Sequence, residues 1–171
     1  VIGAGALLSM SPWLSVFSEV VETSGEKCRL AIIGTGSRGR FLMSFLLQNP
    51  KVEIVALCDI YQPSMEKALN LVREAKVYTD YRKVLENKTV DAVLVATPLN
   101  LHCQIVLDAF DAGKHVFCEK SIGFTMEECF RIYKKHISTG KVFFTGQQRL
   151  FDPRYIKACL LYTSPSPRDC S

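Results

Sequence analysis

The sequence predicts an α/β protein with a doubly wound parallel sheet of the Rossmann type, and three observations support this. An apolar run at residues 30–33 leads directly into the glycine-rich stretch 34–39, GTGSRG, and apolar side chains at helical spacing follow it. Apolar runs and amphipathic runs then alternate along the chain, as they do in βαβ units. The apolar runs are continuous, which is typical of strands covered on both faces.

The first half of the sheet follows from the order of these runs. Asn49-Pro50 ends the first helix, because proline disfavours helical geometry in the residue before it. Pro63 suits the first turn of the second helix, where an N–H group has no helical acceptor. The expected elements are, in order, strand 30–33, helix 37–47, strand 52–57, helix 63–74, strand 77–78 and helix 81–86.

The second half continues the same alternation. Asn100 can cap a helix that Gly113 ends in a left-handed conformation, and Thr125 begins the last helix. The inner face of that last helix is expected to carry Met126, Cys129, Phe130 and Tyr133. The expected elements are strand 90–96, helix 100–112, strand 115–118, helix 125–137 and strand 142–145.

Composition limits the class of protein. A chain of 171 residues, 48% apolar and 22% charged, can form one soluble globular domain with pieces of another. The net charge of +4 is small and scattered, so no nucleic-acid surface is expected. Among the seven cysteines, Cys28, Cys58 and Cys118 lie in or beside apolar runs and no C-x-x-C pair occurs, which predicts buried free thiols and no metal site. Such cysteine usage favours a reducing compartment, that is, the cytoplasm.

The two ends of the chain differ from the centre. Residues 1–17 are apolar and nearly uncharged, which predicts the remnant of an export signal, with 1–26 as leader and linker; the alternative is a stray helix or strand. This run is too short, and too interrupted at Pro12, for a membrane span. We weight export to the periplasm slightly above the cytoplasmic alternative. Residues 159–171 carry two Ser-Pro pairs and no periodic pattern, so we expect a disordered and non-native tail, or else a genuine flexible one.

Ligands of open parallel sheets bind outside the carboxyl ends of the strands, where the glycine stretch lies. One glycine permits the tight turn, one lets the backbone approach a pyrophosphate, and one lets the helix pack on its strand. We therefore expect a dinucleotide at Gly34, Gly36 and Gly39, with Ser37 and Arg38 at the helix N-terminus, whose N–H groups and dipole favour phosphates.

Asp59 follows the second strand, 25 residues beyond Gly34. A carboxylate there suits the two hydroxyls of an adenosine ribose. It repels a 2′-phosphate at about 5 Å by several kcal/mol at an effective dielectric near 20. The expected cofactor is therefore NAD rather than NADP, although Arg38 or Arg40 could weaken that preference. The alternative role for Asp59 is a helix or turn cap.

The later strand ends carry further candidates. Thr97 and Pro98 can form a wall beside the cofactor. His102, in the first turn of a helix, can be a neutral hydrogen-bonding group or a structural residue. Glu119-Lys120 follows the 115–118 strand, where desolvation can lower the pKa of Lys120 so that it moves a proton. The alternative is a surface lysine paired with its acidic neighbour.

Five blocks in one order, over about residues 27–155, resemble the glucose-fructose oxidoreductase and inositol dehydrogenase family: GTGSRGR, LCDIY, VATPLNLH, DAGKHVFCEKS and GQQRLFDPRY. The resemblance implies a nicotinamide dinucleotide and oxidation or reduction of a hydroxyl-bearing carbon on sugars or cyclitols. It places the pyrophosphate on Gly34, Gly36 and Gly39, the ribose on Asp59, and the nicotinamide near Thr97, Pro98 and His102. It makes Glu119 and Lys120 an acid-lysine pair whose lysine assists proton transfer and orients substrate.

The resemblance also divides the chain. Residues 27–150 correspond to the dinucleotide-binding domain, and 151–158 begin the crossover to a second α+β domain that is missing here together with its catalytic Asp and His. Gln148, Arg149 and Tyr155 lie at this crossover. Ser121 stands where the family usually has proline, and Leu99 where it often has asparagine. Any homo-oligomer would form through the missing domain.

The leading hypothesis is an NAD-dependent oxidoreductase of a sugar or polyol, of which this chain is the cofactor-binding part and inactive alone. Hydride would pass between the substrate carbon and the nicotinamide, with Lys120 assisting the proton. One alternative is an NAD-dependent glycoside hydrolase that acts by transient oxidation and elimination. A third hypothesis is a dinucleotide sensor without catalysis.

Overall fold

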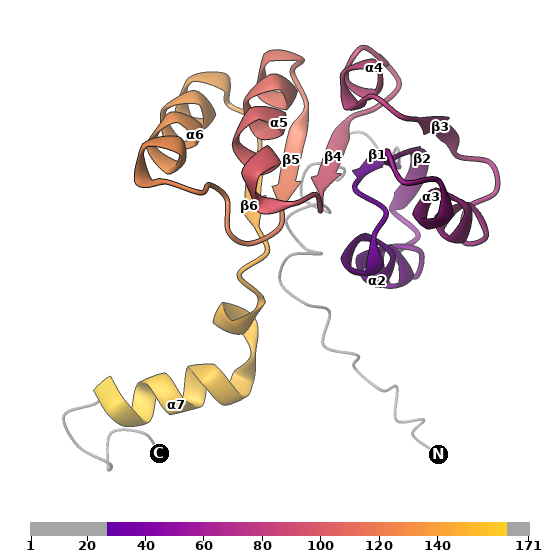
Figure 1. The fold of residues 1–171 in the computed structure, drawn as a ribbon. Helices are drawn as coiled ribbons and strands as arrows, with labels where there is room; N and C mark the ends of the chain where they lie inside the picture. Colours follow the sequence, from indigo (N-terminus) through magenta and orange to yellow (C-terminus); the bar gives the residue numbers. More distant parts are fainter. Residues whose placement is uncertain (1–26, 164–171) are drawn as a thin grey trace, which may run out of the picture.

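The computed structural model describes residues 27–163 and shows one six-stranded sheet, parallel throughout, with helices on both faces (Figure 1). The strand order is β3-β2-β1-β4-β5-β6. The strands are β1 (Cys28–Ile33), β2 (Val52–Cys58), β3 (Lys76–Tyr78), β4 (Ala92–Val95), β5 (His115–Cys118) and β6 (Phe143–Thr145). The helices are α2 (Ser37–Leu46), α3 (Gln62–Leu69), α4 (Tyr81–Leu85), α5 (Leu99–Asp111), α6 (Met126–Thr139), the 3₁₀ helix η1 (Gln148–Phe151) and α7 (Pro153–Thr163). The predicted doubly wound fold is confirmed.

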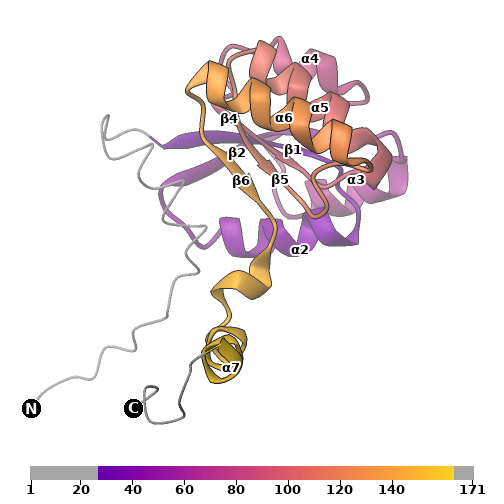
Figure 2. The same cartoon turned by 90° about the vertical axis from the view of Figure 1, so that its left-hand side faces the viewer.

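The sheet separates two apolar cores. Helices α2 and α3 cover one face, and α4, α5 and α6 cover the other (Figure 2). Successive residues of β1 point to opposite cores: Leu30 and Ile32 pack toward α2, while Ala31 and Ile33 pack toward α5. The strand order reverses between β1 and β4, which are paired in register up to their carboxyl ends. That reversal is where open α/β sheets bind ligands.

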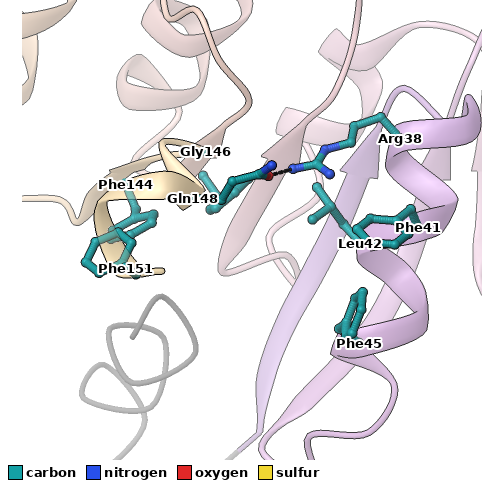
Figure 3. Close-up of a pocket in the computed structure, with 9 residues that line it drawn as sticks. Arg38, Phe41, Leu42, Phe45, Phe144, Gly146, Gln148 and Phe151 are labelled. Atoms are coloured by element: carbon teal, nitrogen blue, oxygen red, sulfur yellow. Dashed lines mark hydrogen bonds between the residues drawn. The ribbon is translucent and has the colours of Figure 1, made fainter. Parts of the chain in front are cut away.

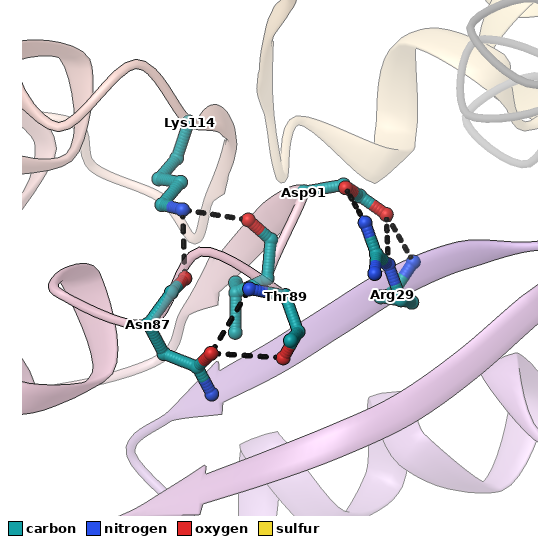
Figure 4. Close-up of polar contacts among 6 residues, drawn as sticks. Arg29, Asn87, Thr89, Asp91 and Lys114 are labelled. Carbon is teal, nitrogen blue, oxygen red and sulfur yellow. Dashed lines mark hydrogen bonds and ion pairs between the residues drawn. The ribbon is translucent and has the colours of Figure 1, made fainter.

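At the amino-terminal ends of the strands, polar contacts hold the start of β4 in place (Figure 4). Asp91 accepts hydrogen bonds from the backbone N, Nε and Nη2 of Arg29 at 2.9–3.0 Å. Lys114 is buried, and its Nζ donates to the carbonyl oxygens of Asn87 at 2.9 Å and Val90 at 2.7 Å. Burial lowers the pKa of Lys114, and the nearby Asp91 carboxylate opposes this shift. These contacts fix the start of β4 far from the carboxyl edge.

The β5–β6 edge contains a titratable contact. His115 Nδ1 accepts a hydrogen bond from the backbone N of Val142 at 3.0 Å, which only a ring with an unprotonated Nδ1 can do. Burial lowers the pKa of His115, Lys141 lowers it further, and Asp91 acts in the opposite direction. The contact is therefore built around the neutral imidazole.

Within residues 27–163, Cys28, Cys58 and Cys118 are buried free thiols, as the sequence predicts. Cys28, Cys58, Cys103 and Cys118 are buried and form no disulfide. Burial raises the pKa of Cys28 to about 11 and that of Cys58 to about 12, so neither thiol is reactive near neutral pH. Within the same residues no cluster of His, Cys, Asp and Glu could hold a metal ion, and no helix could cross a membrane.

Two predicted helix boundaries are wrong. Helix α5 begins at Leu99, and Pro98, with φ of −56°, occupies the N-cap position without a capping side chain. Asn100 therefore lies inside the first turn and is not the cap, because the preceding proline already sets the entry into the helix. Helix α3 ends at Leu69 instead of residue 74, and a turn at Asn70 leads into β3.

The predicted inner face of α6 is also wrong. Only Ile132 of this helix is fully buried; Cys129 is half-buried, and Met126, Phe130 and Tyr133 are exposed. The helix packs mainly on α5, so its inner side is a narrow stripe that includes no other large apolar residue. The apolar residues used to assign the face lie instead on the solvent side.

The ends of the chain are only partly described. Residues 1–26, the predicted leader and linker, and residues 164–171 lie outside the described part. Residues 159–163, expected in a disordered tail, instead continue α7. Asp152 caps this helix, since its Oδ1 accepts from the backbone N of Arg154 at 2.9 Å, and Pro153 suits the first turn.

Candidate functional site

The three glycines of the loop between β1 and α2 have three different surroundings. Gly34 has φ of +96°, and a Cβ there would lie 2.5 Å from the carbonyl oxygen of Ala96. A Cβ on Gly39 would overlap the carbonyl oxygen of Gly34. A Cβ on Gly36 would meet no atom of residues 27–163 within 4 Å. Gly34 thus makes the turn, Gly39 allows the helix to pack on the loop, and Gly36 leaves open space in front of the backbone.

This open space faces an uncapped helix. Gly36 is the N-cap of α2, and no side chain within residues 27–163 accepts a hydrogen bond from the first turn, which begins with Ser37. The first N–H groups of such a helix are left for an external acceptor, and the helix dipole favours a negative one. The loop is therefore compatible with a pyrophosphate group.

Asp59 lies at the end of β2 and is tied to the same loop. Its Oδ2 accepts from the backbone N of Thr35 at 2.7 Å and from Thr35 Oγ1 at 3.0 Å, and its Oδ1 accepts from the backbone N of Tyr61 at 2.9 Å. Asp59 therefore does cap a turn, the alternative considered for it. Three contacts leave a carboxylate with acceptor capacity for a further donor, so the structure is compatible with the ribose role as well.

The two arginines of the loop point to different places. Arg40 Nη1 donates to the carbonyl oxygen of Thr35 at 2.6 Å, next to Asp59. Arg38 instead pairs with Glu119, with Nη2 at 2.7 Å and Nε at 2.8 Å from Oε1, and its Nη2 is 2.5 Å from Gln148 Oε1. Arg40 is thus the cation beside the predicted ribose site, whereas Arg38 joins the loop to the ends of β5 and β6.

A hollow of about 360 Å³ opens at the carboxyl ends of β4 and β5, beside this pair. It brings together five residues that the sequence nominated, namely Arg38, Thr97, His102, Glu119 and Lys120, and adds Ala96, Leu99 and Gln148. Thr97 Oγ1 is buried and has no hydrogen-bond partner among residues 27–163. A buried hydroxyl without a partner is costly, so this atom is suited to bond a ligand.

The remaining nominated residues do not line this hollow. They are Gly34, Gly36, Ser37 and Gly39 in the loop, Pro98 at the start of α5, and Asp59 after β2.

Glu119 is the most enclosed charged group of the site, with 5% of its surface exposed. Gly146, after β6, lies against its carboxyl group, since a Cβ on Gly146 would be 2.9 Å from the carboxyl carbon. Sequence reasoning missed Gly146 and gave Gln148 no role in the site. The signal was available, because GQQ directly follows a predicted strand and so lies at the same edge as the other candidates.

His102 is held between two loops. Only 2% of its surface is exposed, and its Nδ1 and Nε2 lie 2.6 Å from the Ser121 carbonyl oxygen and 2.9 Å from the Thr97 carbonyl oxygen. Both ring nitrogens are thus occupied by backbone oxygens, as expected of the structural alternative. The residue positions the chain on both sides of the hollow.

Lys120 is exposed and lies where this hollow meets a second one, formed with Gln147, Gln148 and Arg149. Its backbone N donates to Glu119 Oε2 at 3.2 Å. The burial that would desolvate its ammonium group is therefore not provided by residues 27–163.

An apolar hollow of about 170 Å³ adjoins the site on the α2 side (Figure 3). The Arg38–Gln148 hydrogen bond forms its border with the first hollow, since both residues line both spaces. Phenylalanines from α2, β5, β6 and η1 make up its wall: Phe41, Phe45, Phe117, Phe144 and Phe151.

Known proteins share this architecture. An inositol 2-dehydrogenase/D-chiro-inositol 3-dehydrogenase of Shouchella clausii is 34% identical over 132 residues, covering 75% of this chain and 38% of that protein. A "Glycosyl hydrolase family 109 protein" of Stenotrophomonas maltophilia is 34% identical over 151 residues, covering 81% and 31%. The crystal structure of myo-inositol 2-dehydrogenase from Lactobacillus plantarum superimposes with a TM-score of 0.73 at 29% identity, covering 80% of this chain and 42% of that one.

The chain therefore spans less than half the length of these relatives. Residues 28–147 match the family described as "Oxidoreductase family, NAD-binding Rossmann fold". This match covers all six strands and every residue of the first hollow except Gln148. It confirms the resemblance found in the sequence and NAD as the cofactor of the family. The chain belongs to this oxidoreductase family and carries its NAD-binding domain.

Proposed function

We propose that the intact protein transfers a hydride between NAD, held on this domain, and a hydroxyl-bearing carbon of a sugar or polyol. One observation carries the proposal: the carboxyl edge of the sheet unites the uncapped N-terminus of α2, the Thr97 hydroxyl, which has no partner among residues 27–163, and the Glu119-Lys120 pair. Bound nicotinamide supplies the hydride acceptor or donor.

The residues of this chain have separate proposed roles. The loop, with Gly34, Gly36, Ser37, Arg38 and Gly39, holds the pyrophosphate. Asp59 binds the adenosine ribose, which favours NAD over NADP. Thr97, Pro98 and His102 form the wall beside the nicotinamide, and Glu119 contributes to that side of the cofactor site. Lys120, which lines the hollow and is exposed, orients the substrate hydroxyl and assists transfer of its proton.

The substrate class is inferred from the relatives. Those named inositol dehydrogenases act, by their names, on a cyclic polyol. An exposed Lys120 is compatible with a site completed by a second domain that encloses the substrate. Export, which residues 1–17 favour, stays a prediction, and the cytoplasmic alternative agrees with the buried thiols.

Two measurements test the proposal. Titration of this chain with NADH, followed by nicotinamide fluorescence, should show saturable binding that Asp59→Ala weakens. In the full-length protein, Lys120→Ala should lower kcat on inositols or sugars by about 10²–10⁴-fold and leave NADH binding unchanged. Lys67→Ala, an exposed lysine on α3, is the matched control. Full turnover in the Lys120 variant would show that the assignment is wrong.

A second candidate function is NAD-dependent glycoside hydrolysis, and the family 109 relative at 34% identity specifically favours it. In this reaction Lys120 would again assist the proton of the substrate hydroxyl while that carbon is transiently oxidised. Elimination of the aglycone would follow, with no net redox change. The full-length protein should then release the aglycone from aryl glycosides without added NAD. Hydride transfer to added NAD⁺ from a free polyol, without aglycone release, selects the first function. NADH binding with neither activity would indicate the non-catalytic sensor.

A further inference from the structure

Helix α6 carries an apolar stripe on its solvent side. Met126, Phe130, Tyr133 and Ile137 are 72, 58, 59 and 62% exposed, and their spacing of four, three and four residues places them on one face. The stripe extends over about 16 Å of helix. Monomeric proteins rarely leave such a contiguous row of large apolar side chains in water.

The helix is rigidly attached, so the stripe does not result from a loosely placed segment. Thr125 and Glu128 form a capping box at its start, and Gly140 ends it in a left-handed conformation. On the inner side Ile132 is buried, and Lys135 forms an ion pair with Asp111 of α5. Figure 1 shows α6 at the outer end of its layer, beside α5, and Figure 2 shows it in front of α5.

Two charges flank the stripe on its side away from α5. Glu127 and Lys134 are two turns apart, one residue after Met126 and Tyr133, respectively. Neither forms an ion pair or a side-chain hydrogen bond with another residue of 27–163. The flank is therefore acidic toward the start of the helix and basic toward its end.

The charges beside the stripe are complementary to those of a second copy of α6 that runs in the opposite direction. Two copies of α6 packed antiparallel bring their stripes together and place Glu127 of each copy opposite Lys134 of the other. In a parallel two-fold pair the two flanks would lie on opposite sides of the interface, so these charges would not meet. Antiparallel packing also aligns the helix dipoles favourably, and a two-fold axis permits a closed dimer.

We infer that a second copy of this chain covers the stripe, in a symmetric dimer formed by antiparallel α6 helices. The dimer does not require the cofactor. It is distinct from any association through a second domain, because all the contacts come from α6.

Sedimentation equilibrium of the 171-residue chain without NAD, over about 1–200 μM, tests the inference. The chain should dimerise, and Phe130→Glu should raise the dissociation constant at least about 100-fold, since each dimer loses two central apolar contacts. The control Leu160→Glu alters an equally exposed apolar residue on α7 and should leave the dimer intact. Thermal unfolding monitored by circular dichroism should be the same for both variants, because both residues are exposed.

Charge exchange tests the orientation of the helices. Glu127→Lys alone and Lys134→Glu alone should each weaken the dimer by about 2- to 30-fold, because two ion pairs per dimer are replaced by repulsion. The double variant E127K/K134E should restore it. A chain that stays monomeric at all concentrations overturns the inference, including the case in which the stripe binds anionic phosphatidylglycerol vesicles instead. A dimer that Phe130→Glu leaves unchanged, or that the double variant fails to restore, overturns it as well.

Discussion

Substitution of Gly36 by alanine should affect NADH binding and leave stability unchanged, whereas substitution of Gly39 by alanine should lower stability, although the two residues are in the same loop. At Gly36 the added methyl group meets no atom of residues 27–163 within 4 Å, and the backbone angles of −58° and −172° suit alanine. Alanine is a poorer N-cap than glycine by up to about 1 kcal/mol. The reduced entropy of the unfolded chain offsets this by about 0.4–1 kcal/mol. Stability should therefore stay unchanged.

The two variants should differ in which property they change: Gly36→Ala should weaken NADH binding, and Gly39→Ala should lower stability. The methyl group of Gly36→Ala fills the space through which the backbone approaches a pyrophosphate, so the dissociation constant for NADH should rise at least tenfold, about 1.4 kcal/mol. Gly39→Ala forces the loop apart at the Gly34 carbonyl, which should cost about 1–3 kcal/mol of stability. For a chain of this size that corresponds to a fall in melting temperature of roughly 2–12 °C.

NADH fluorescence titration and thermal unfolding of both variants measure the two effects separately. If Gly36→Ala binds NADH as tightly as the unmodified chain, the pyrophosphate does not lie at this loop and the reasoning fails. Equal melting temperatures for Gly39→Ala and the unmodified chain would show that the helix does not pack on the loop as described.

Three further predictions follow from single contacts. Asp59→Asn removes the charge that repels a 2′-phosphate, so the preference for NADH over NADPH in fluorescence titrations should fall at least about tenfold; an unchanged ratio would contradict this role. His115 has a folded pKa below its usual 6.5, so the unfolded chain binds the extra proton and stability should fall as pH decreases through and below 6.5. Urea titrations at several pH values should show this loss, and His115→Asn, which keeps an acceptor for the Val142 N–H, should remove it. Lys114→Met leaves two backbone carbonyl groups, one of them from Asn87, without their donor, and should lower the free energy of unfolding by about 1–3 kcal/mol; a smaller loss than for an exposed lysine variant would refute it.

The features that depend on residues close in the sequence could be predicted from the sequence. The glycines, the uncapped start of α2 and the strand ends follow from short-range chemistry and from the rule that parallel strands present their carboxyl ends at one edge. The six strands appear in the predicted order for the same reason. Thr97 and Glu119 reach the site because each directly follows a strand.

What the sequence did not predict depends on contacts between distant residues. Arg38 and Arg40 are two residues apart and look alike in the sequence, yet only the packed structure directs one to Glu119 and the other to Thr35. The inner face of α6 was misassigned because apolar content was taken to mean burial, whereas a helix at the edge of a layer can present its apolar side outward. The position of GQQ after a predicted strand placed Gln148 at the edge of the sheet that carries the site, but its bond with Arg38 depends on how the chain turns after β6.

The bond between Arg38 and Glu119 has a thermodynamic consequence. It connects the first loop of the fold to the end of β5 across β4, over 81 positions of sequence. An anion that takes over the guanidinium group releases Glu119 and Gln148 from it. Anion binding at the loop and release of Glu119 from Arg38 are then thermodynamically coupled. The free energy by which release of Glu119 favours anion binding equals the free energy by which the bound anion favours that release.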